Sequence, residues 1–252
     1  MPGSFSNSGS LKIIAITCVY RDTSNILKVL SKFPKKTVDE IFMVVDCADK
    51  NDLEEIEKTT AKTETPLKII SHEERKGVGN AIREGIEYAL RSGYDIAVLF
   101  AGNNKDDPRE IPRLLRPILN EGYDYVQGSR FLPGGRHIKN PMLRGMFSRL
   151  FPFAWTFFTK VRCTDVTNGF RAYRTRIFND ERINVWQDWL NGYGLEYYVH
   201  YKVLTLGYKF KEVPVSKVYP HRHRGGYSRI SPFRDWWQIV GPLVYLKLGF
   251  RK

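Results

Sequence analysis

The sequence is poor in cysteine and has no long apolar run, and both absences narrow the class of protein. Its 252 residues include three cysteines, Cys18, Cys47 and Cys163, none of them in a CxxC pair. This sparse, odd set predicts reduced thiols in a cytosolic protein and argues against a disulfide framework or a zinc site. No run of about 18 apolar residues occurs, so no transmembrane helix is predicted. The polar first ten residues do not resemble a signal peptide.

Acidic residues are also scarce, and the glycine pattern of dinucleotide-binding proteins is missing. The chain has 40 Lys and Arg against 27 Asp and Glu, a net charge of +13. This surplus points to anionic partners: phosphorylated substrates, an anionic membrane or nucleic acid. The basic residues do not gather on one helix and no nucleic-acid motif is present, so no nucleic-acid partner is expected. The absence of GxGxxG after the first apolar run argues against a Rossmann dehydrogenase.

Strand-like and helix-like segments alternate along the first half of the chain. Short apolar runs predict strands at residues 11–20, 40–45, 67–71, 96–100 and 123–128. Apolar residues at helical spacing predict helices at 26–33, 49–62, 81–90 and 109–120. This repeated order predicts an α/β fold with a mostly parallel sheet and right-handed crossovers.

One polar loop follows the apolar strand at 96–100. Turn residues and charges fill Gly102 to Asp107, and Pro108 then opens a helix. Open α/β sheets bind ligands where a strand ends and a helix begins, so we expect a ligand here rather than an ordinary connection. The glycine turn at 76–80 leaves a similar choice. Its backbone amides either bind a phosphate at a helix N-terminus or belong to an ordinary turn.

The last third of the chain is aromatic and basic. Residues 142–161, which contain Pro152, predict either a kinked core helix or a helix near a lipid surface. Residues 192–207 predict a helix, and 208–218 predict a strand that Pro214 marks as an edge. The final segment, 219–252, has a basic half followed by an apolar half.

Eight segments, in order between about Leu11 and Ile230, resemble those of inverting family-2 glycosyltransferases of the GT-A fold. They are IIAITCVYRD, EIFMVVDCAD, RKGVGNAIREGI, AGNNKDDPREIPRLL, YDYVQGSRFLPGG, CTDVTNGFRAYR, GYGLEYYVHYKVLTLGYKFKEVPV and GGYSR. Within that family the pattern is most similar to dolichol-phosphate mannose synthase and other polyprenyl-phosphate glycosyltransferases. The resemblance implies a Rossmann-like three-layer α/β sandwich over residues 11–218. Before it we expect a disordered head at 1–10, and after it a basic, amphipathic segment at 219–252 that associates with a membrane or a partner.

The resemblance implies a nucleotide-sugar donor, with UDP or GDP, held over one edge of the sheet. Positions that match the nucleotide-sugar site of the family are Val19, Tyr20, Asp22, Asp46, Lys76, Gly77, Gly102 and Asn103. Among them, Asp46 is expected to accept a hydrogen bond from the base, although a strand-end cap is the alternative role.

The chain departs from the family where an Asp-x-Asp pair would hold Mg²⁺ or Mn²⁺. Ala101 and Asn103 occupy those two positions, and Lys105 follows two residues later. Hard divalent cations prefer anionic oxygen ligands. Either Asn103 binds the metal together with Asp106 or Asp107, or no metal is bound and the Lys105 ammonium neutralises the pyrophosphate. We favour the second interpretation.

The acceptor implied by the resemblance is a polyprenyl phosphate at the cytoplasmic face of an anionic membrane, where the protein is peripheral. Positions matching the acceptor-phosphate site are Arg130, Arg136, Arg171, Ser228 and Arg229. Asp165 is expected to face the sugar or to position the acceptor. An acceptor hydroxyl on a saccharide would need a base, for which Asp165 and Glu196 are the candidates. With Lys105 and Arg130 these carboxylates form the predicted catalytic set. Because Asp-x-Asp is lost, a non-catalytic binding module is a further alternative.

Overall fold

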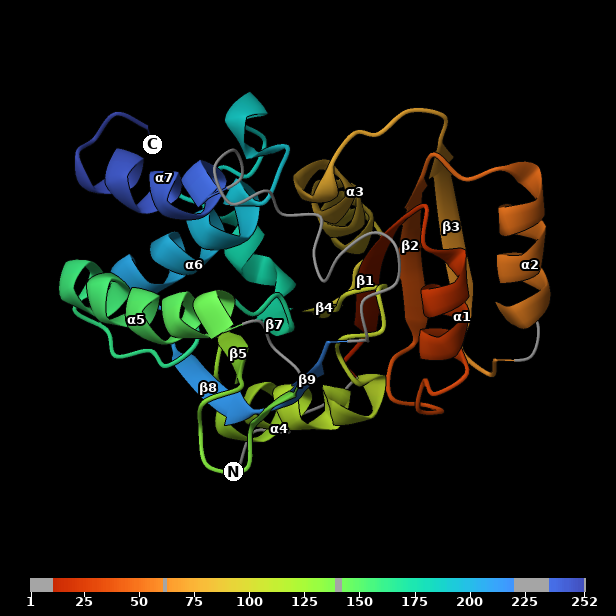
Figure 1. Cartoon of the computed structure of the whole chain (residues 1–252), viewed down its shortest axis with the longest axis horizontal. Coiled ribbons are helices and arrows are strands. Elements are labelled where there is room, and N and C mark those ends of the chain that lie inside the picture. The colour runs from red at the N-terminus through yellow and green to blue at the C-terminus, as the bar shows by residue number, and fades with distance from the viewer. Residues whose placement is uncertain (1–10, 61–62, 139–141, 220–235, 252) are drawn as a thin grey trace, which may run out of the picture.

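The computed structural model describes residues 11–60, 63–138, 142–219 and 236–251, and it is built on one seven-stranded sheet (Figure 1). The strand order is β3-β2-β1-β4-β7-β5-β8. The strands are β1 (Ile13–Tyr20), β2 (Glu40–Asp46), β3 (Leu67–His72), β4 (Ile96–Leu99), β5 (Tyr125–Ser129), β7 (Arg171–Arg174) and β8 (Phe210–Pro214). A second, two-stranded sheet pairs β6 (Arg136–Ile138) with β9 (Ser216–Val218).

Helices cover both faces of the large sheet. They are α1 (Thr23–Leu30), α2 (Lys50–Thr60), α3 (Val78–Arg91), α4 (Ile111–Glu121), α5 (Met142–Thr159), α6 (Gly194–Thr205) and α7 (Trp236–Lys247). Three short 3-10 helices are η1 (Pro108–Glu110), η2 (Thr175–Asn179) and η3 (Asp188–Leu190). Within the described ranges, no helix is both long enough and apolar enough to cross a membrane.

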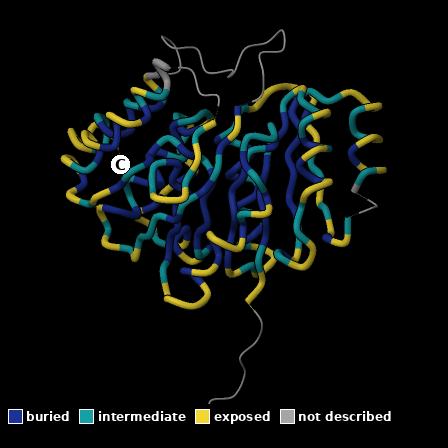
Figure 2. The backbone as a smooth tube through the Cα atoms, turned by 60° about the horizontal axis from the view of Figure 1, so that its bottom comes forward, coloured by how far each residue is buried: buried dark blue, intermediate teal, exposed yellow. Residues whose placement is uncertain are grey.

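The core lies in two apolar layers, one on each side of the sheet. One layer packs α1 and α4 on the sheet through residues such as Ile26, Leu30 and Leu114. The other packs α3 and α6 through residues such as Ile86 and Val203. The central strands β1, β2, β4, β5 and β7 are mostly buried, as the dark central band of Figure 2 shows, whereas the outer strands β3 and β8 are only partly buried. This is the predicted three-layer α/β arrangement with a mostly parallel sheet, and the prediction of the fold class is confirmed.

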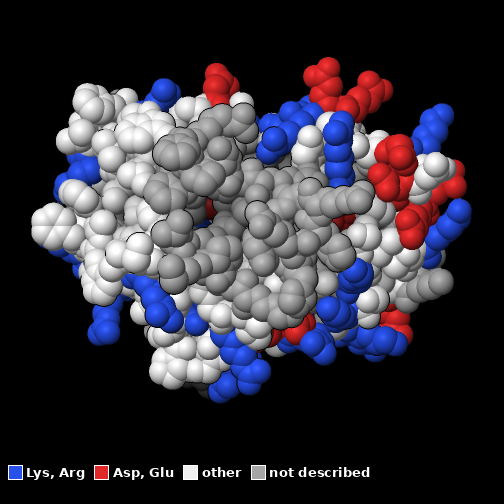
Figure 3. Space-filling view, viewed as in Figure 1, with Lys and Arg blue, Asp and Glu red and all other residues white. Residues whose placement is uncertain are grey.

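A third apolar cluster joins α5, α6 and α7 at one end of the molecule. Trp155 of α5 is fully buried there, beside Tyr197 of α6 and Leu243 of α7. The opposite face of α5 carries exposed apolar side chains: Met146, Leu150, Phe153 and Phe157. In Figure 3 this end, at the left, is mostly uncharged, whereas the acidic side chains gather mainly toward the right.

The predicted strands and helices of the first half are present within a few residues of their expected ends. Three differences occur later in the chain. The expected strand at 208–218 is two strands, because the chain passes at Val215 from the large sheet to the small one. The Val215 N–H donates to the Ser129 carbonyl, and the Val215 carbonyl accepts from the Arg136 N–H. The other two differences are β6 and β7, which were not predicted as strands: β6 pairs with β9, and β7 pairs antiparallel with β4 and β5. The expectation of an edge strand at Pro214 is confirmed, since β8 ends the sheet.

The sheet topology brings several polar loops to one edge. The other six strands of the large sheet run parallel, so the loops that follow them leave at the same edge. Because β7 runs the other way, the loop before it, at residues 163–170, also lies there. The segments after β1, β2, β4 and β5 therefore meet the loop before β7 at a single edge.

Candidate active site

Asp46 ties the end of β2 to the glycine turn before α3. One carboxylate oxygen lies 2.9 Å from Nδ1 of His72, and the other accepts from the backbone N–H groups of Lys76 and Gly77, each at 3.2 Å. The side chain is buried. Lys76 and Gly77 thus lie beside Asp46, as expected for a nucleotide pocket. The predicted bond from Asp46 to a nucleotide base would have to share oxygens that these protein groups already use, and it stays a prediction.

The glycine turn packs against the loop before α6. A Cβ atom on Gly79 would lie 1.9 Å from the carbonyl oxygen of Leu190, so no larger residue fits there. The N–H groups of Gly79 and Asn80 both donate to the carbonyl of Asn191, at 2.9 and 3.3 Å. Four amides of this turn, those of residues 76, 77, 79 and 80, are therefore used by the protein itself. Of the two interpretations of this turn, these hydrogen bonds favour the ordinary packing turn over a phosphate-binding one.

The end of β1 lies beside that of β2. Tyr20 is the register partner of Asp46, and the Arg75 guanidinium lies 4.8 Å from the Tyr20 ring centre. Asp22 accepts a hydrogen bond from the Asn25 side chain at 2.7 Å. Val19 is buried in the core. The strand register thus brings the predicted nucleotide residues at the ends of β1 and β2 together. The Val19 side chain packs into the core, so only its backbone could contact a nucleotide.

The loop after β4 passes directly over β1. A Cβ atom on Gly102 would lie 2.8 Å from the carbonyl oxygen of Cys18, which explains a glycine at this position. Nearby, Oδ1 of Asn103 and Oγ1 of Thr17 are buried without a hydrogen-bond partner among the described residues. Buried polar atoms are normally satisfied, so these two oxygens are candidates to accept a hydrogen bond from a bound molecule or a water. Thr17 was not predicted, because a threonine inside an apolar strand carries no signal of its own.

The residues of this loop do not fit a divalent cation. Asp106 accepts from the Lys217 ammonium at 2.7 Å and, through its other oxygen, from the Ala101 N–H at 3.0 Å. Asp107 is paired with Arg109, whose hydrogen bonds lower the pKa of that carboxyl. Over the described part of the chain, no three His, Cys, Asp or Glu side chains are grouped to hold a metal. The oxygen left is that of the neutral Asn103 amide, a weak ligand for Mg²⁺ or Mn²⁺.

Arg130 and Asp165 form a buried ion pair on the other side of this edge. Two guanidinium nitrogens lie 2.6 and 2.7 Å from the two carboxylate oxygens, and the third donates to the Tyr219 hydroxyl at 3.0 Å. Burial alone would lower the pKa of Arg130, yet Asp165 raises it above its ordinary value. Asp165 is 0% exposed, which argues against its facing the sugar or acting as a base, whereas the alternative that it positions the acceptor, through Arg130, stays a prediction. To bind the acceptor phosphate, the Arg130 guanidinium would have to give up one of its hydrogen bonds to Asp165 or Tyr219.

Arg171 is a framework residue. Its side chain is 1% exposed and donates to the carbonyls of Val166, Asn168 and Glu196, at 2.9, 2.9 and 2.6 Å. It therefore holds the loop before β7 in place and does not reach an acceptor phosphate, which corrects that prediction. The Glu196 carboxylate keeps partial exposure. It also contributes, after burial and together with Asp46, to raising the pKa of the Cys18 thiol to about 12, so these groups share one region.

Lys105 meets the acceptor side of the site at Tyr219. Its ammonium lies 5.4 Å from the Tyr219 ring centre, and the hydroxyl of that ring accepts from Arg130. Arg136 is exposed on β6, and its backbone N–H bonds Val215. Ser228 and Arg229 lie outside the described residues. Lys105, Arg130 and Asp46 are thus at one edge of the sheet, as the sequence predicts.

Besides Thr17, one further residue of this region was missed from the sequence. Lys217, on β9, is buried and donates to Asp106 and Asn168. In an alternating strand a lysine is expected to face solvent, so the sequence pattern predicted an exposed side chain here.

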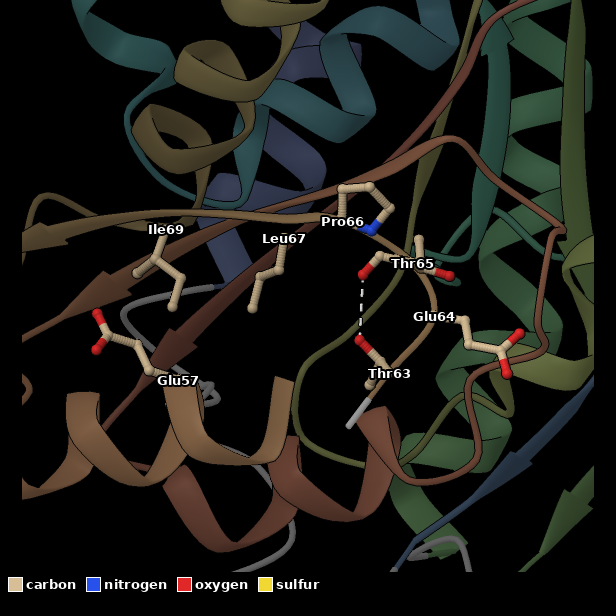
Figure 4. Close-up of a pocket in the computed structure, with 7 residues that line it drawn as sticks. All are labelled: Glu57, Thr63, Glu64, Thr65, Pro66, Leu67 and Ile69. Carbon is tan, nitrogen blue, oxygen red and sulfur yellow. Dashed lines mark hydrogen bonds between the residues drawn. The ribbon is translucent and has the colours of Figure 1, made fainter. Parts of the chain in front are cut away.

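The hollow that Figure 4 shows lies at the start of β3. Its volume is about 430 Å³, and it is lined by Thr63 to Leu67 with Glu57 and Ile69. It is at the opposite edge of the sheet and is not part of this site.

Comparison with known proteins adds a family match and relatives of similar length. The profile of the family described as glycosyl transferase family 2 matches residues 15–182. An undecaprenyl-phosphate mannosyltransferase of Micrococcus luteus is 25% identical over 208 residues, which cover 82% of this chain and 84% of that protein. A polyprenol monophosphomannose synthase of Mycolicibacterium smegmatis is 28% identical, over 59% of this chain and 55% of that protein.

Solved structures resemble the fold. A glucosyl-3-phosphoglycerate synthase from Mycobacterium tuberculosis, in complex with Mg²⁺ and UDP, gives a TM-score of 0.64 at 16% sequence identity. The match covers 93% of this chain and 80% of that one. At this identity the likeness supports the GT-A fold and nothing finer.

Proposed function

We propose, from the premise that the chain belongs to glycosyl transferase family 2, that it moves a sugar from a nucleotide-sugar donor to a polyprenyl phosphate with inversion. That it is a glycosyltransferase follows from the family. The structural observation that supports a phosphate acceptor is the burial of Asp165 in its pair with Arg130. A phosphate oxygen is already anionic at neutral pH and needs no base, whereas a sugar hydroxyl does. The relatives named above act on such lipid phosphates by their names.

The donor is proposed to lie over the ends of β1 and β2 and the loop after β4. Tyr20, Asp46 and Lys76 would surround the nucleotide, and the unpaired oxygens of Thr17 and Asn103 would face the diphosphate sugar. Either UDP or GDP is compatible with this set, because Asp46 can accept from an N–H of uracil or of guanine.

The leaving diphosphate is proposed to be neutralised by Lys105 rather than by a metal ion. The two aspartates that follow it are paired with Lys217 and Arg109, so the loop lacks carboxylates for a cation. In the reaction, an acceptor phosphate oxygen forms a bond to the anomeric carbon from the side opposite the leaving group. The bond from that carbon to the diphosphate breaks, and the nucleoside diphosphate departs with the electron pair. Positive side chains stabilise the charge that builds up there.

The acceptor is proposed to come from a membrane surface on which α5 and α7 rest. Phe153 and Phe157 of α5 are 73% and 66% exposed, and Phe250, just after α7, is 73% exposed. Basic side chains stand near them, including Arg149 and Lys160. Exposed aromatic residues with flanking cations are typical of helices that lie in an anionic membrane interface. We therefore propose a peripheral enzyme at the cytoplasmic face of such a membrane.

A donor panel with defined acceptors tests this function. Purified protein is incubated with UDP- and GDP-sugars and with a polyprenyl phosphate, the matching polyprenol, or a free saccharide, and products are identified by mass spectrometry. The expected product is a polyprenyl phosphate that carries one sugar, formed equally well with a chelator present. Transfer only to the saccharide would contradict the proposal and would favour Glu196 as a base. Donor binding without turnover on any acceptor would favour a non-catalytic module.

Turnover that stops with chelator and returns with Mn²⁺ would contradict the metal-free part of the proposal. The lipid-phosphate product would still be formed in that case, so the acceptor and the metal are tested separately.

A further inference from the structure

Lys217 is a lysine whose charged end is placed inside the protein. The residue is 8% exposed, and its ammonium lies 2.7 Å from Oδ1 of Asp106 and 2.9 Å from Oδ1 of Asn168. A buried ammonium is costly to desolvate unless it is paired and hydrogen bonded, so this placement needs a compensating partner, which Asp106 supplies.

The ammonium holds the loop after β4 from the inside. The second oxygen of Asp106 accepts from the Ala101 N–H at 3.0 Å, which fixes both ends of the segment from Ala101 to Asp106. The backbone adds a bridge between Asp106 and Lys217, and the Val218 N–H donates to the carbonyl of Lys105 at 3.0 Å. The loop is therefore attached to β9 by main chain and side chain together.

Asn168 extends the same network to the acceptor side. Its amide nitrogen donates to the carbonyl of Gly128 in β5 at 2.9 Å, while its oxygen accepts from Lys217. Three segments, the loop after β4, the end of β5 and the loop before β7, are thus joined through one ammonium. A metal ion bound by loop carboxylates would join segments and supply positive charge in a comparable way.

We propose that Lys217 is a positioning residue that replaces a divalent cation as the organiser of the loop at residues 101–107. The proposal rests on the proposed function. Because Lys217 neutralises Asp106 and bonds Asn168, it holds the loop at residues 101–107 in place beside the proposed donor site. Without Lys217, the loop would lose its attachment to β9 and to Asn168, and the Asp106 carboxylate, left without its counter-charge, would become an oxygen ligand for a metal ion.

Binding of nucleoside diphosphate to Lys217→Met tests the proposal without any acceptor. Isothermal titration with UDP and with GDP is expected to give a Kd at least about tenfold weaker than wild type, the usual worth of one charge-assisted contact. Lys217→Arg keeps the charge and is expected to bind within a few-fold of wild type. Since misfolding lowers the active fraction rather than the affinity of the remaining sites, the Kd separates positioning from a merely structural role.

A second readout is Mn²⁺ binding, followed by electron paramagnetic resonance with Mn²⁺ alone. Lys217→Met is expected to bind Mn²⁺ through the Asp106 carboxylate that has lost its counter-charge, and wild type is not. The double variant Asp106→Asn/Lys217→Met removes both charges of the pair, so it is expected to fold, to bind nucleotide weakly and to bind no Mn²⁺.

Wild-type affinity for nucleotide in Lys217→Met or in the double variant would overturn the role of Lys217, as would Mn²⁺ binding by wild type or none by Lys217→Met. If wild type binds neither UDP nor GDP, the proposed function itself fails, and that result is distinct from a failure confined to Lys217.

Discussion

Single charged residues at the sheet edge serve mainly to bind one another. Arg130 pairs with Asp165, Arg171 bonds three carbonyl groups, and Lys217 pairs with Asp106. Buried cations of this kind are stable only when every donor has a partner. They therefore build the framework of this edge of the sheet, whereas Lys105 and Glu196 are only partly buried and Lys76 is exposed.

The sequence could place these charges but not their orientation. The family resemblance puts Arg130, Asp165 and Arg171 in loops that the sheet topology brings to one edge, and the structure places them there. Arg130 points into the protein because it pairs with Asp165, which is 35 residues away in the sequence. Arg171 points inward because it bonds backbone carbonyl groups, including that of Glu196. No local pattern records such a partner, so framework residues were mistaken for ligand contacts.

His200 is a buried neutral histidine that makes stability depend on pH. Its Nδ1 lies 2.8 Å from the Tyr125 hydroxyl, and burial, with Arg171 nearby, lowers its pKa well below the ordinary value. Below about pH 6.5 the unfolded chain therefore binds a proton that the folded protein does not. The free energy of unfolding is expected to fall with decreasing pH there, by up to about 1.4 kcal/mol per pH unit from this residue.

Urea unfolding of wild type and His200→Asn between about pH 7 and pH 5 measures this effect. Asn keeps a polar group near Tyr125 but does not titrate, so its unfolding free energy is expected to fall less steeply. Parallel curves for the two proteins would show that His200 does not carry the dependence.

Among the elements, β7 decides how the two halves of the sheet are joined. It lies between β4 and β5 and pairs antiparallel with both. Its four residues, Arg-Ala-Tyr-Arg, have charged ends and too little length for an alternating pattern, which is why it was not predicted. The arginines are tolerated because Arg171 and Arg174 both bond backbone carbonyls. The longer apolar strands, in contrast, were predicted from their β-branched runs alone.

The pair of Arg130 and Asp165 joins the end of β5 to the loop before β7. We expect Asp165→Asn to lower the free energy of unfolding by about 3–5 kcal/mol, because a buried guanidinium is left without its counter-charge. The double variant Arg130→Met/Asp165→Leu removes both charges and is expected to be less destabilised than the single one. Denaturant unfolding of the three proteins gives the comparison, and a double variant less stable than Asp165→Asn would contradict the assignment.

The whole molecule is asymmetric, with one end, built from α5 and α7, that exposes many apolar side chains. The net charge of +13 and the exposed apolar side chains of this end would act together at an anionic bilayer. The sequence left open whether residues 142–161 form a core helix or a surface helix. The structure contains both features, since Trp155 is buried against α6 while Phe153 and Phe157 face outward.

We expect the protein to float with anionic vesicles, less so as salt is raised, and Phe153→Ser/Phe157→Ser to bind at least about tenfold more weakly. Each phenylalanine side chain removed from an apolar environment costs about 1.5–3 kcal/mol. Leu119→Ser, at an exposed leucine on α4, is the matched control and is expected to bind like wild type. Equal flotation with and without vesicles would argue against a membrane role.

In the sheet β7 lies between β4 and β5, but in the sequence it follows both. The central strands are therefore synthesised in a different order from their order in the sheet. Ile96–Leu99 and Tyr125–Ser129 are synthesised first and could pair directly, before Arg171–Arg174 exists. At usual elongation rates that interval lasts on the order of several seconds. During it, β4 is an apolar strand with one open edge, the kind of edge that invites wrong pairing. Each newly made chain must therefore keep a gap in its half-built sheet, or reopen one, before the last central strand can enter.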